Sequence, residues 1–139
     1  MRYLLAAAML PLVIGCAATR KEPPPKPFVG TRWEAILELP MPGEQPNFRF
    51  GDGRMEGFGG CNRLSARYVQ DTVGARAVVI GRIETGMRSC DPGVQAAESR
   101  MMEVLQAVSS YTITADSMTM TGSGGSLKFR ALPTPDAKP

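Results

Sequence analysis

The sequence predicts a mainly β fold with one α-helix, in which about eight short strands form a curled antiparallel sheet or small barrel. Two observations support this prediction. Apolar residues alternate with polar ones along most of the chain, as in strands with one buried face. Only the stretch between Pro92 and Val108 repeats its apolar residues every three or four positions, as an amphipathic helix does. This helix precedes the last three predicted strands.

The predicted strands before the helix are separated by turn-forming residues. The first alternates four apolar residues with two glutamates: Trp33, Ala35, Leu37 and Leu39 with Glu34 and Glu38. The second contains Phe48 and Phe50. The Gly51-Asp52-Gly53 turn leads into a third strand over 55–60, because glycine and aspartate tolerate the positive φ of a tight hairpin. A fourth covers 64–69, and the β-branched segment 75–83 is typical of a central strand.

The helix has clear start signals. Asp91 is a favourable N-cap, and Pro92 suits the first helical position. We expect one apolar face to pack over the sheet through about four turns: Val94, Ala97, Met101, Leu105 and Val108. Polar residues lie off that face: Gln95, Glu98, Ser99 and Glu103. The final strands then alternate around Tyr111 and Ile113, around Met118 and Met120, and around Leu127 and Phe129.

Residues 1–15 resemble the signal peptide of a bacterial lipoprotein. A basic start at Arg2 precedes a short apolar run that ends in Val13-Ile14-Gly15-Cys16. This ending resembles a lipobox, which implies cleavage after Gly15 and a lipid on Cys16. The alternative is a plain signal peptide with an unrelated cysteine. Because Ala17 is not the aspartate that commonly retains such proteins in the inner membrane, we expect a location in the cell envelope, at the outer membrane facing the periplasm.

The rest of the chain divides into three parts. Residues 16–31 are rich in proline, which predicts a semi-rigid tether whose lipid attaches the protein to the membrane. Residues 32–131 have the length of one ordinary domain. Residues 132–139 are again rich in proline, and we expect a frayed, disordered tail.

The composition argues against catalysis, a metal or cofactor, and a nucleic-acid partner. The chain has no histidine, which removes the commonest general base and zinc ligand. Its 16 basic and 13 acidic residues are spread along the sequence. If Cys16 carries lipid, Cys61 and Cys90 remain as an even pair, and in an exported protein a disulfide is the default. A bond between these two cysteines would restrict the unfolded chain and thereby stabilise the folded state by about 3–4 kcal/mol.

The densest motif is Gly57-Phe58-Gly59-Gly60-Cys61-Asn62-Arg63. Predicted strands flank it on both sides, so it does not fit a phosphate loop, and we expect a sharp bend instead. This motif resembles one of the META/HslJ domain family, and the resemblance covers about residues 28–131. It also includes Tyr68, the run Thr85-Gly86-Met87-Arg88-Ser89-Cys90, Glu98 and the Trp33 strand. Ala66-Arg67 departs from the family pattern, which usually has a glycine before the tyrosine. The resemblance implies a small conical barrel, the Cys61–Cys90 pair, and envelope or stress-related roles, and it supplies no catalytic mechanism.

These features predict an anchored binding or structural module without catalysis. One version docks an envelope protein through a sheet edge or through exposed arginines in loops, and Arg54 and Arg63 are the candidate binding residues. The alternative is a barrel that binds an acyl chain or another apolar ligand, as a pilotin-like protein would. A packed interior favours the first version and a continuous apolar cavity the second.

Overall fold

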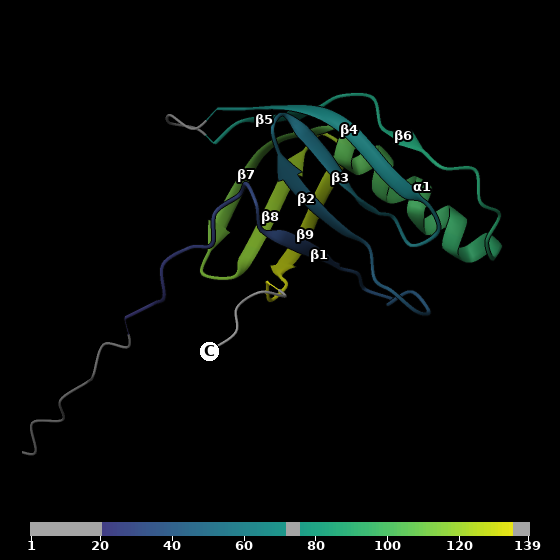
Figure 1. The fold of residues 1–139 in the computed structure, drawn as a ribbon, viewed down its shortest axis with the longest axis horizontal. Helices are drawn as coiled ribbons and strands as arrows, with labels where there is room; N and C mark the ends of the chain where they lie inside the picture. Colours follow the sequence, from purple (N-terminus) through teal and green to yellow (C-terminus); the bar gives the residue numbers. More distant parts are fainter. Residues whose placement is uncertain (1–20, 72–75, 135–139) are drawn as a thin grey trace, which may run out of the picture.

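The computed structural model describes residues 21–71 and 76–134. As predicted, the fold is mainly β, with one helix before the last three strands (Figure 1). The described residues form nine strands, of which the two-residue β6 was not predicted. The elements are β1 (Arg32–Ile36), β2 (Asn47–Gly51), β3 (Arg54–Phe58), β4 (Arg63–Gln70), β5 (Val78–Ile80), β6 (Glu84–Thr85), α1 (Pro92–Gln106), β7 (Val108–Thr114), β8 (Ser117–Gly122) and β9 (Gly125–Ala131).

Eight strands form an almost closed antiparallel barrel. Hydrogen-bonded neighbours follow the order β5-β4-β3-β2-β1-β9-β8-β7, and β6 adds to β4. The first and last strands of this order meet at one isolated bridge, Ala77–Ser110, beside a hydrogen bond of 3.1 Å from the Tyr111 N–H to the Arg76 carbonyl. We call this junction the β5–β7 seam, because it has far fewer backbone pairs than the other strand contacts.

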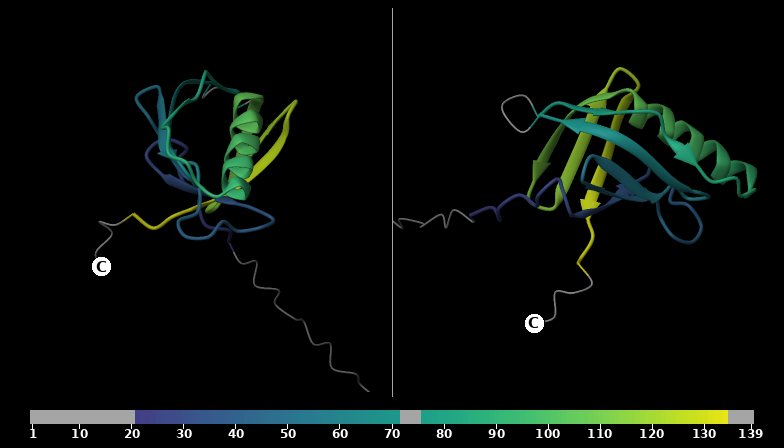
Figure 2. Two further views of the ribbon diagram at one scale, coloured as in Figure 1. Left: turned by 90° about the vertical axis from the view of Figure 1, so that its right-hand side faces the viewer. Right: turned by 45° about the horizontal axis from the view of Figure 1, so that its top comes forward.

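Connections gather at two ends of the barrel because its neighbouring strands are antiparallel. One end carries the turns at 52–53 and 115–116 and the segment 26–30, and we call it the plug end. The other carries the turn at 59–62, the segment 86–91 and α1, and we call it the helix end. Figure 1 shows the chain entering at the plug end on the left and α1 on the right, and Figure 2 shows α1 beside the ring of strands.

The helix begins as predicted, but its buried face differs. The Asp91 side chain accepts the Gly93 N–H at 2.9 Å, and Pro92 is the first helical residue. Ala97 is exposed and Val94 only half-buried, whereas Glu98 and Val104 are buried with Met101 and Leu105. Val108 is buried as expected, but it begins β7. The predicted face was therefore wrong by part of a turn. Among the described residues, no helix is long and apolar enough to cross a membrane.

The strand predictions hold best where a tight turn fixes the register. The hairpin between β2 and β3 turns at Asp52 and Gly53, with φ of 49° and 71°, as the sequence indicates. The first strand is shorter than predicted, since β1 ends at Ile36 and Leu39 is 85 % exposed. Pro40, Pro42 and Pro46 lack the N–H that would extend this strand's hydrogen bonding. Of the predicted strand 75–83, residues 76–83 are described, and within them only β5 forms a strand; it lies at one end of the strand order and not at its centre.

Large side chains fill the barrel interior. The inward alternation of the strands places Trp33, Phe48 and Phe129 within 1 % of complete burial, and Met101 and Leu105 of α1 cover them from the helix end. The most completely buried large side chains are Trp33, Phe48, Phe50, Phe129, Met55, Leu105, Met118 and Met120. Methionine thioethers adapt to irregular gaps between rings, so the two methionines of β8 pack in the core as hydrophobic residues.

The chain joins the fold before residue 32, where the sequence places the start of the domain. Phe28 is 5 % exposed and belongs to the core cluster. Three backbone contacts hold its neighbours: the Lys26 N–H donates to the Ala115 carbonyl at 2.7 Å, the Gly30 N–H donates to the Phe50 carbonyl at 2.9 Å, and Val29 forms an isolated bridge with Phe50. The last part of the predicted tether is thus packed against the plug end.

Candidate functional site

The conspicuous sequence motif forms a clamp at the helix end. In the turn between β3 and β4, the Cys61 and Asn62 N–H groups donate to Glu98 Oε2 at 2.9 and 2.7 Å. The Asn62 side chain donates to Glu98 Oε1 at 3.0 Å. Glu98 is only 3 % exposed, so these three bonds replace the water that a charged carboxylate would otherwise hold. The clamp therefore fastens the middle of α1 to the turn.

A glycine makes this approach feasible. A Cβ atom on Gly59 would lie 2.5 Å from Glu98 Oε2 and 2.8 Å from Leu64 Cδ1. Both distances are shorter than van der Waals contact, so only glycine lets the turn pass this close to the buried carboxylate. The sharp bend expected from the glycine-rich motif is present, and it leaves room for the Glu98 carboxylate.

Asn62 extends the clamp to the segment before the helix. Its Oδ1 accepts the Arg88 N–H at 2.7 Å. Cys61 and Cys90 form the expected disulfide, with Cα atoms 5.9 Å apart. The Gly86 N–H also donates to the Arg63 carbonyl at 3.1 Å. The segment 86–91 is thus held at both of its ends, by a covalent bond and by hydrogen bonds.

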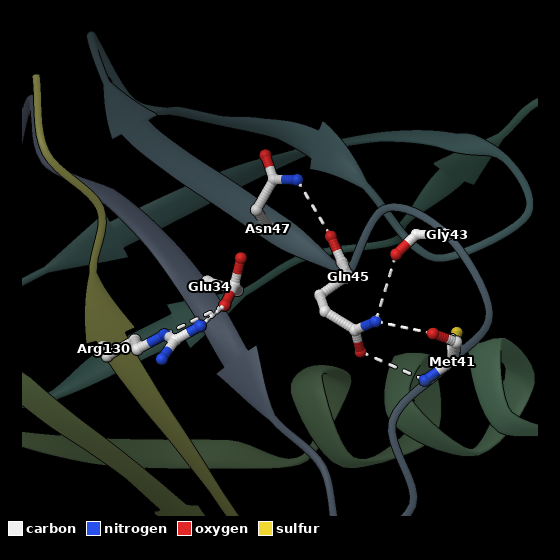
Figure 3. A network of polar contacts seen from close by, with 6 residues as sticks. All are labelled: Glu34, Met41, Gly43, Gln45, Asn47 and Arg130. Carbon is white, nitrogen blue, oxygen red and sulfur yellow. Dashed lines mark hydrogen bonds and ion pairs between the residues drawn. The ribbon is translucent and has the colours of Figure 1, made fainter. Parts of the chain in front are cut away.

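The loop between β1 and β2 supports the same end of the barrel (Figure 3). The Gln45 side chain donates to the Met41 carbonyl at 2.6 Å and to the Gly43 carbonyl at 3.2 Å, and it accepts the Met41 N–H at 3.1 Å. Met41 is buried against Gly60, where a Cβ would lie 2.1 Å from its sulfur. Beside this loop, Arg130 donates to Glu34 at 2.9 Å and links β9 to β1.

The clamp leaves no buried side-chain nitrogen or oxygen without a hydrogen-bond partner among the described residues, and the same is true throughout residues 21–71 and 76–134. The same part of the chain contains no group of three or more Cys, Asp or Glu side chains arranged to hold a metal. The Glu98 carboxylate is buried, and its three hydrogen bonds are all to the turn between β3 and β4. The arrangement at Glu98 is therefore structural.

The two candidate binding arginines lie at opposite ends of the β3–β4 hairpin. Arg54 faces Arg67 across the strands near the plug end and forms an exposed ion pair with Glu56 at 3.5 Å. Arg63 faces Phe58 near the helix end. Four residues of strand separate the two positions, which is about 13 Å. The structure does not bring Arg54 and Arg63 into one site.

Arg63 has an apolar neighbour that the sequence did not single out for binding. Arg63 is exposed and forms no ion pair with any described residue. Its carbonyl holds Gly86, and the next residue, Met87, is 100 % exposed. The disulfide and the Asn62–Arg88 bond fix the segment that carries Met87. An unpaired charge and an exposed apolar residue therefore lie in neighbouring segments of the helix end.

Sequence reasoning did not assign Glu98 and Asn62 their structural roles. Glu98 follows Val94 by four residues and precedes Met101 by three, so it lies on a helical stripe as regular as the one predicted through Ala97. Its charge led to the opposite assignment. Cys16 and the signal segment 1–15 lie outside the described residues.

Comparisons with known proteins agree with this architecture. The META domain profile matches residues 27–133. An NMR structure of a protein from Burkholderia xenovorans is similar, with a TM-score of 0.61 and 18 % identity over 96 % of this chain and 99 % of that one. A crystal structure of a DUF4847 family protein from Bacteroides vulgatus has a TM-score of 0.56 and 13 % identity, over 74 % and 93 % of the two chains. At these identities the likeness concerns the fold alone. None of the curated proteins matches the sequence. The profile match covers most of the chain, and the chain therefore belongs to the META domain family.

Proposed function

We propose that this protein is an envelope lipoprotein, anchored by a lipid on Cys16, whose META domain binds another envelope protein without catalysis. The packed barrel interior is the observation that carries the binding proposal. Trp33, Phe48 and Phe129 fill the space in which an apolar ligand would have to lie. Recognition is then left to the outer surface. The acyl-binding, pilotin-like alternative has less support for the same reason.

The direction in which the chain enters the fold favours one end of the barrel as the docking surface. The segment 26–30 packs at the plug end, so the predicted tether leads from there to the membrane. Residues 16–25, if extended as polyproline, span about 30 Å. In that arrangement the helix end points away from the membrane. Arg63 and Met87 lie at this more accessible end, whereas Arg54 lies near the anchor.

We define the docking surface as Arg63 and Met87, and its partner as a protein segment that offers a carboxylate beside an apolar side chain. The guanidinium of Arg63 suits bidentate hydrogen bonding to a carboxylate. Met87 can adapt its flexible thioether to an apolar partner residue. Because the clamp already holds this segment, little conformational entropy is lost on binding.

Crosslinking in cells tests this surface. We expect Arg63→Glu and Met87→Ser each to reduce the amount of partner captured, and the matched variant Arg54→Glu to leave capture unchanged. All three side chains are exposed, so the melting temperature should change by no more than about 2 °C. Equal capture by wild type and by the Arg63 and Met87 variants would contradict the proposal. So would a hydrolytic or transferase activity that persists through repurification.

The anchor is tested separately. Cells grown with an alkyne fatty acid should incorporate the label into the wild-type chain and not into the Cys16→Ala variant. Membrane fractionation should place the wild type in the outer membrane and release the variant. A variant that keeps both the label and the membrane location would contradict lipidation at Cys16.

A further inference from the structure

The plug end is closed by an aromatic ring from outside the sheet. Phe28 packs against Phe50 and Tyr111 with tilted rings, whose centroids are 4.3 and 4.5 Å away, and meets Tyr68 edge-on at 5.8 Å. The three surrounding rings come from β2, β4 and β7, which are paired with other strands of the barrel. Phe28 comes from an irregular segment held by two backbone hydrogen bonds, one isolated bridge and one hydrogen bond from the Trp33 indole. The surrounding site is therefore more rigid than its occupant.

This ring also spans the weakest junction of the barrel. Tyr111 lies on β7, on one side of the β5–β7 seam, while Tyr68 lies on β4, beside β5, on the other. A hydrogen bond from Gln70 to the Tyr111 hydroxyl crosses the same gap. Since only one backbone bridge and one further backbone hydrogen bond join the two edges among the described residues, contacts through Phe28 add to the closure there.

We propose that Phe50, Tyr68 and Tyr111 form a binding site for an aromatic ring, and that the chain occupies this site with its own Phe28 as a releasable plug. A ring of the size of the phenylalanine side chain fits the vacated space, and the neighbouring rings favour an aromatic over an aliphatic occupant through their edge and face contacts. When the segment 26–30 detaches, the site becomes open to an external aromatic ligand. This proposal is independent of lipidation and of the Arg63 surface.

The chain carries a built-in reporter of the plug. Trp33 is the single tryptophan in the sequence, and its indole N–H donates to the Phe28 carbonyl at 3.2 Å. The indole is completely buried. Detachment of the plug breaks this hydrogen bond, so the fluorescence of Trp33 and the exchange of its indole proton report plug release directly.

The first experiment empties the site and refills it with toluene as the probe. Apolar cavities created by truncation bind small aromatic molecules. We expect Phe28→Ala in the full chain to lower the melting temperature by about 10 °C or more. Toluene should raise the melting temperature of this variant in a saturable manner and leave that of Phe28→Leu, whose side chain fills the site, unchanged. Val29→Ala, at the exposed neighbouring residue, is the matched control that keeps the plug. If Phe28→Ala folds and toluene does not stabilise it more than Phe28→Leu, the proposal is overturned.

The second experiment uses the wild-type chain, so it remains decisive if Phe28→Ala does not fold. We expect the protection of the Trp33 indole proton, relative to its exchange in an unstructured chain, to be at least tenfold lower than that of the amide protons of Phe48 and Met120, which are both fully buried in the barrel. Toluene should accelerate the indole exchange further, because it traps the open site. Equal protection of all three protons, unaffected by toluene, would show that the plug leaves only on global unfolding and would overturn the proposal.

Discussion

The two ends of this barrel are closed by different chemistry. At the helix end, a buried carboxylate, an asparagine side chain and a disulfide join three segments that are distant in sequence. At the plug end, one phenylalanine packs among three aromatic rings. The polar clamp depends on specific geometry, because each buried donor needs its acceptor. The aromatic closure depends mainly on apolar contact and tolerates exchange of its occupant.

This difference predicts how each end fails. Removing one hydrogen-bonding group from the clamp leaves buried polar groups without partners. This lowers the free energy of unfolding and destabilises the whole helix end. Removing the plug leaves an apolar cavity that another ring can refill. The helix end therefore provides a fixed frame for recognition, and the plug end provides the site at which the fold can open locally.

The largest effect is expected at Glu98. Replacement by alanine leaves the Cys61 and Asn62 N–H groups and the Asn62 side chain without their acceptor, so we expect a loss of at least about 4 kcal/mol in the free energy of unfolding. Glu98→Gln keeps one acceptor oxygen and should lose less. Urea unfolding measures both. Glu103→Ala, on the exposed face of the same helix, is the control and should change stability by less than about 0.5 kcal/mol.

Loss of the disulfide should lower the free energy of unfolding somewhat less than replacement of Glu98 by alanine does. Replacing both Cys61 and Cys90 with serine removes a crosslink that closes a loop with a sequence separation of 29 residues. We expect a loss of about 3 kcal/mol, with the clamp hydrogen bonds still formed at low temperature. A thiol count on the denatured, non-reduced chain provides the complementary check. Two reactive thiols from this pair would show that the bond is absent in the protein as isolated.

A single methyl group at Gly59 tests how closely the clamp is packed. Gly59→Ala places a Cβ against Glu98 Oε2 and should cost about 2 kcal/mol by overpacking. Gly51→Ala is the matched control, because a Cβ there has no heavy atom within 4 Å. Chemical denaturation of the two variants compares them directly. Equal stabilities would mean that the turn shifts away from Glu98 at little cost.

The plug end should respond to alkaline pH. Burial raises the pKa of the Tyr68 hydroxyl above 10.0, and the charges of Asp52 and of Tyr111 add to the shift. The unfolded chain therefore ionises Tyr68 first, so its contribution to stability is present below about pH 10 and is lost as the pH rises towards the folded-state pKa. Tyr68→Phe should reduce the loss of unfolding free energy at alkaline pH and change stability little at pH 7. Unfolding free energies at pH 7 and above pH 10 measure the difference, and identical pH profiles for wild type and variant would contradict it.

The fold class, the position of the helix and most strands could be predicted before the structure was known. These features follow from local signals: the alternation around Trp33 and Phe129, the Asp52-Gly53 turn, and the Asp91-Pro92 start of α1. The glycine-rich motif and its cysteine also indicated where the chain bends and to which residue it is joined. Such signals act over a few residues, so they can be read without knowing the rest of the chain.

Tertiary structure alone decided which residues serve the two ends. Glu98 looked like a surface residue until the turn of β3 and β4 brought two backbone donors and Asn62 to it. Phe28 looked like part of a tether until the barrel supplied three rings around it. Arg54 and Arg63 were both candidate binding residues, and the strand register places them at opposite ends of the β3–β4 hairpin. In each case the deciding partner is far away in sequence, and contacts of that kind leave no local periodicity from which to predict them.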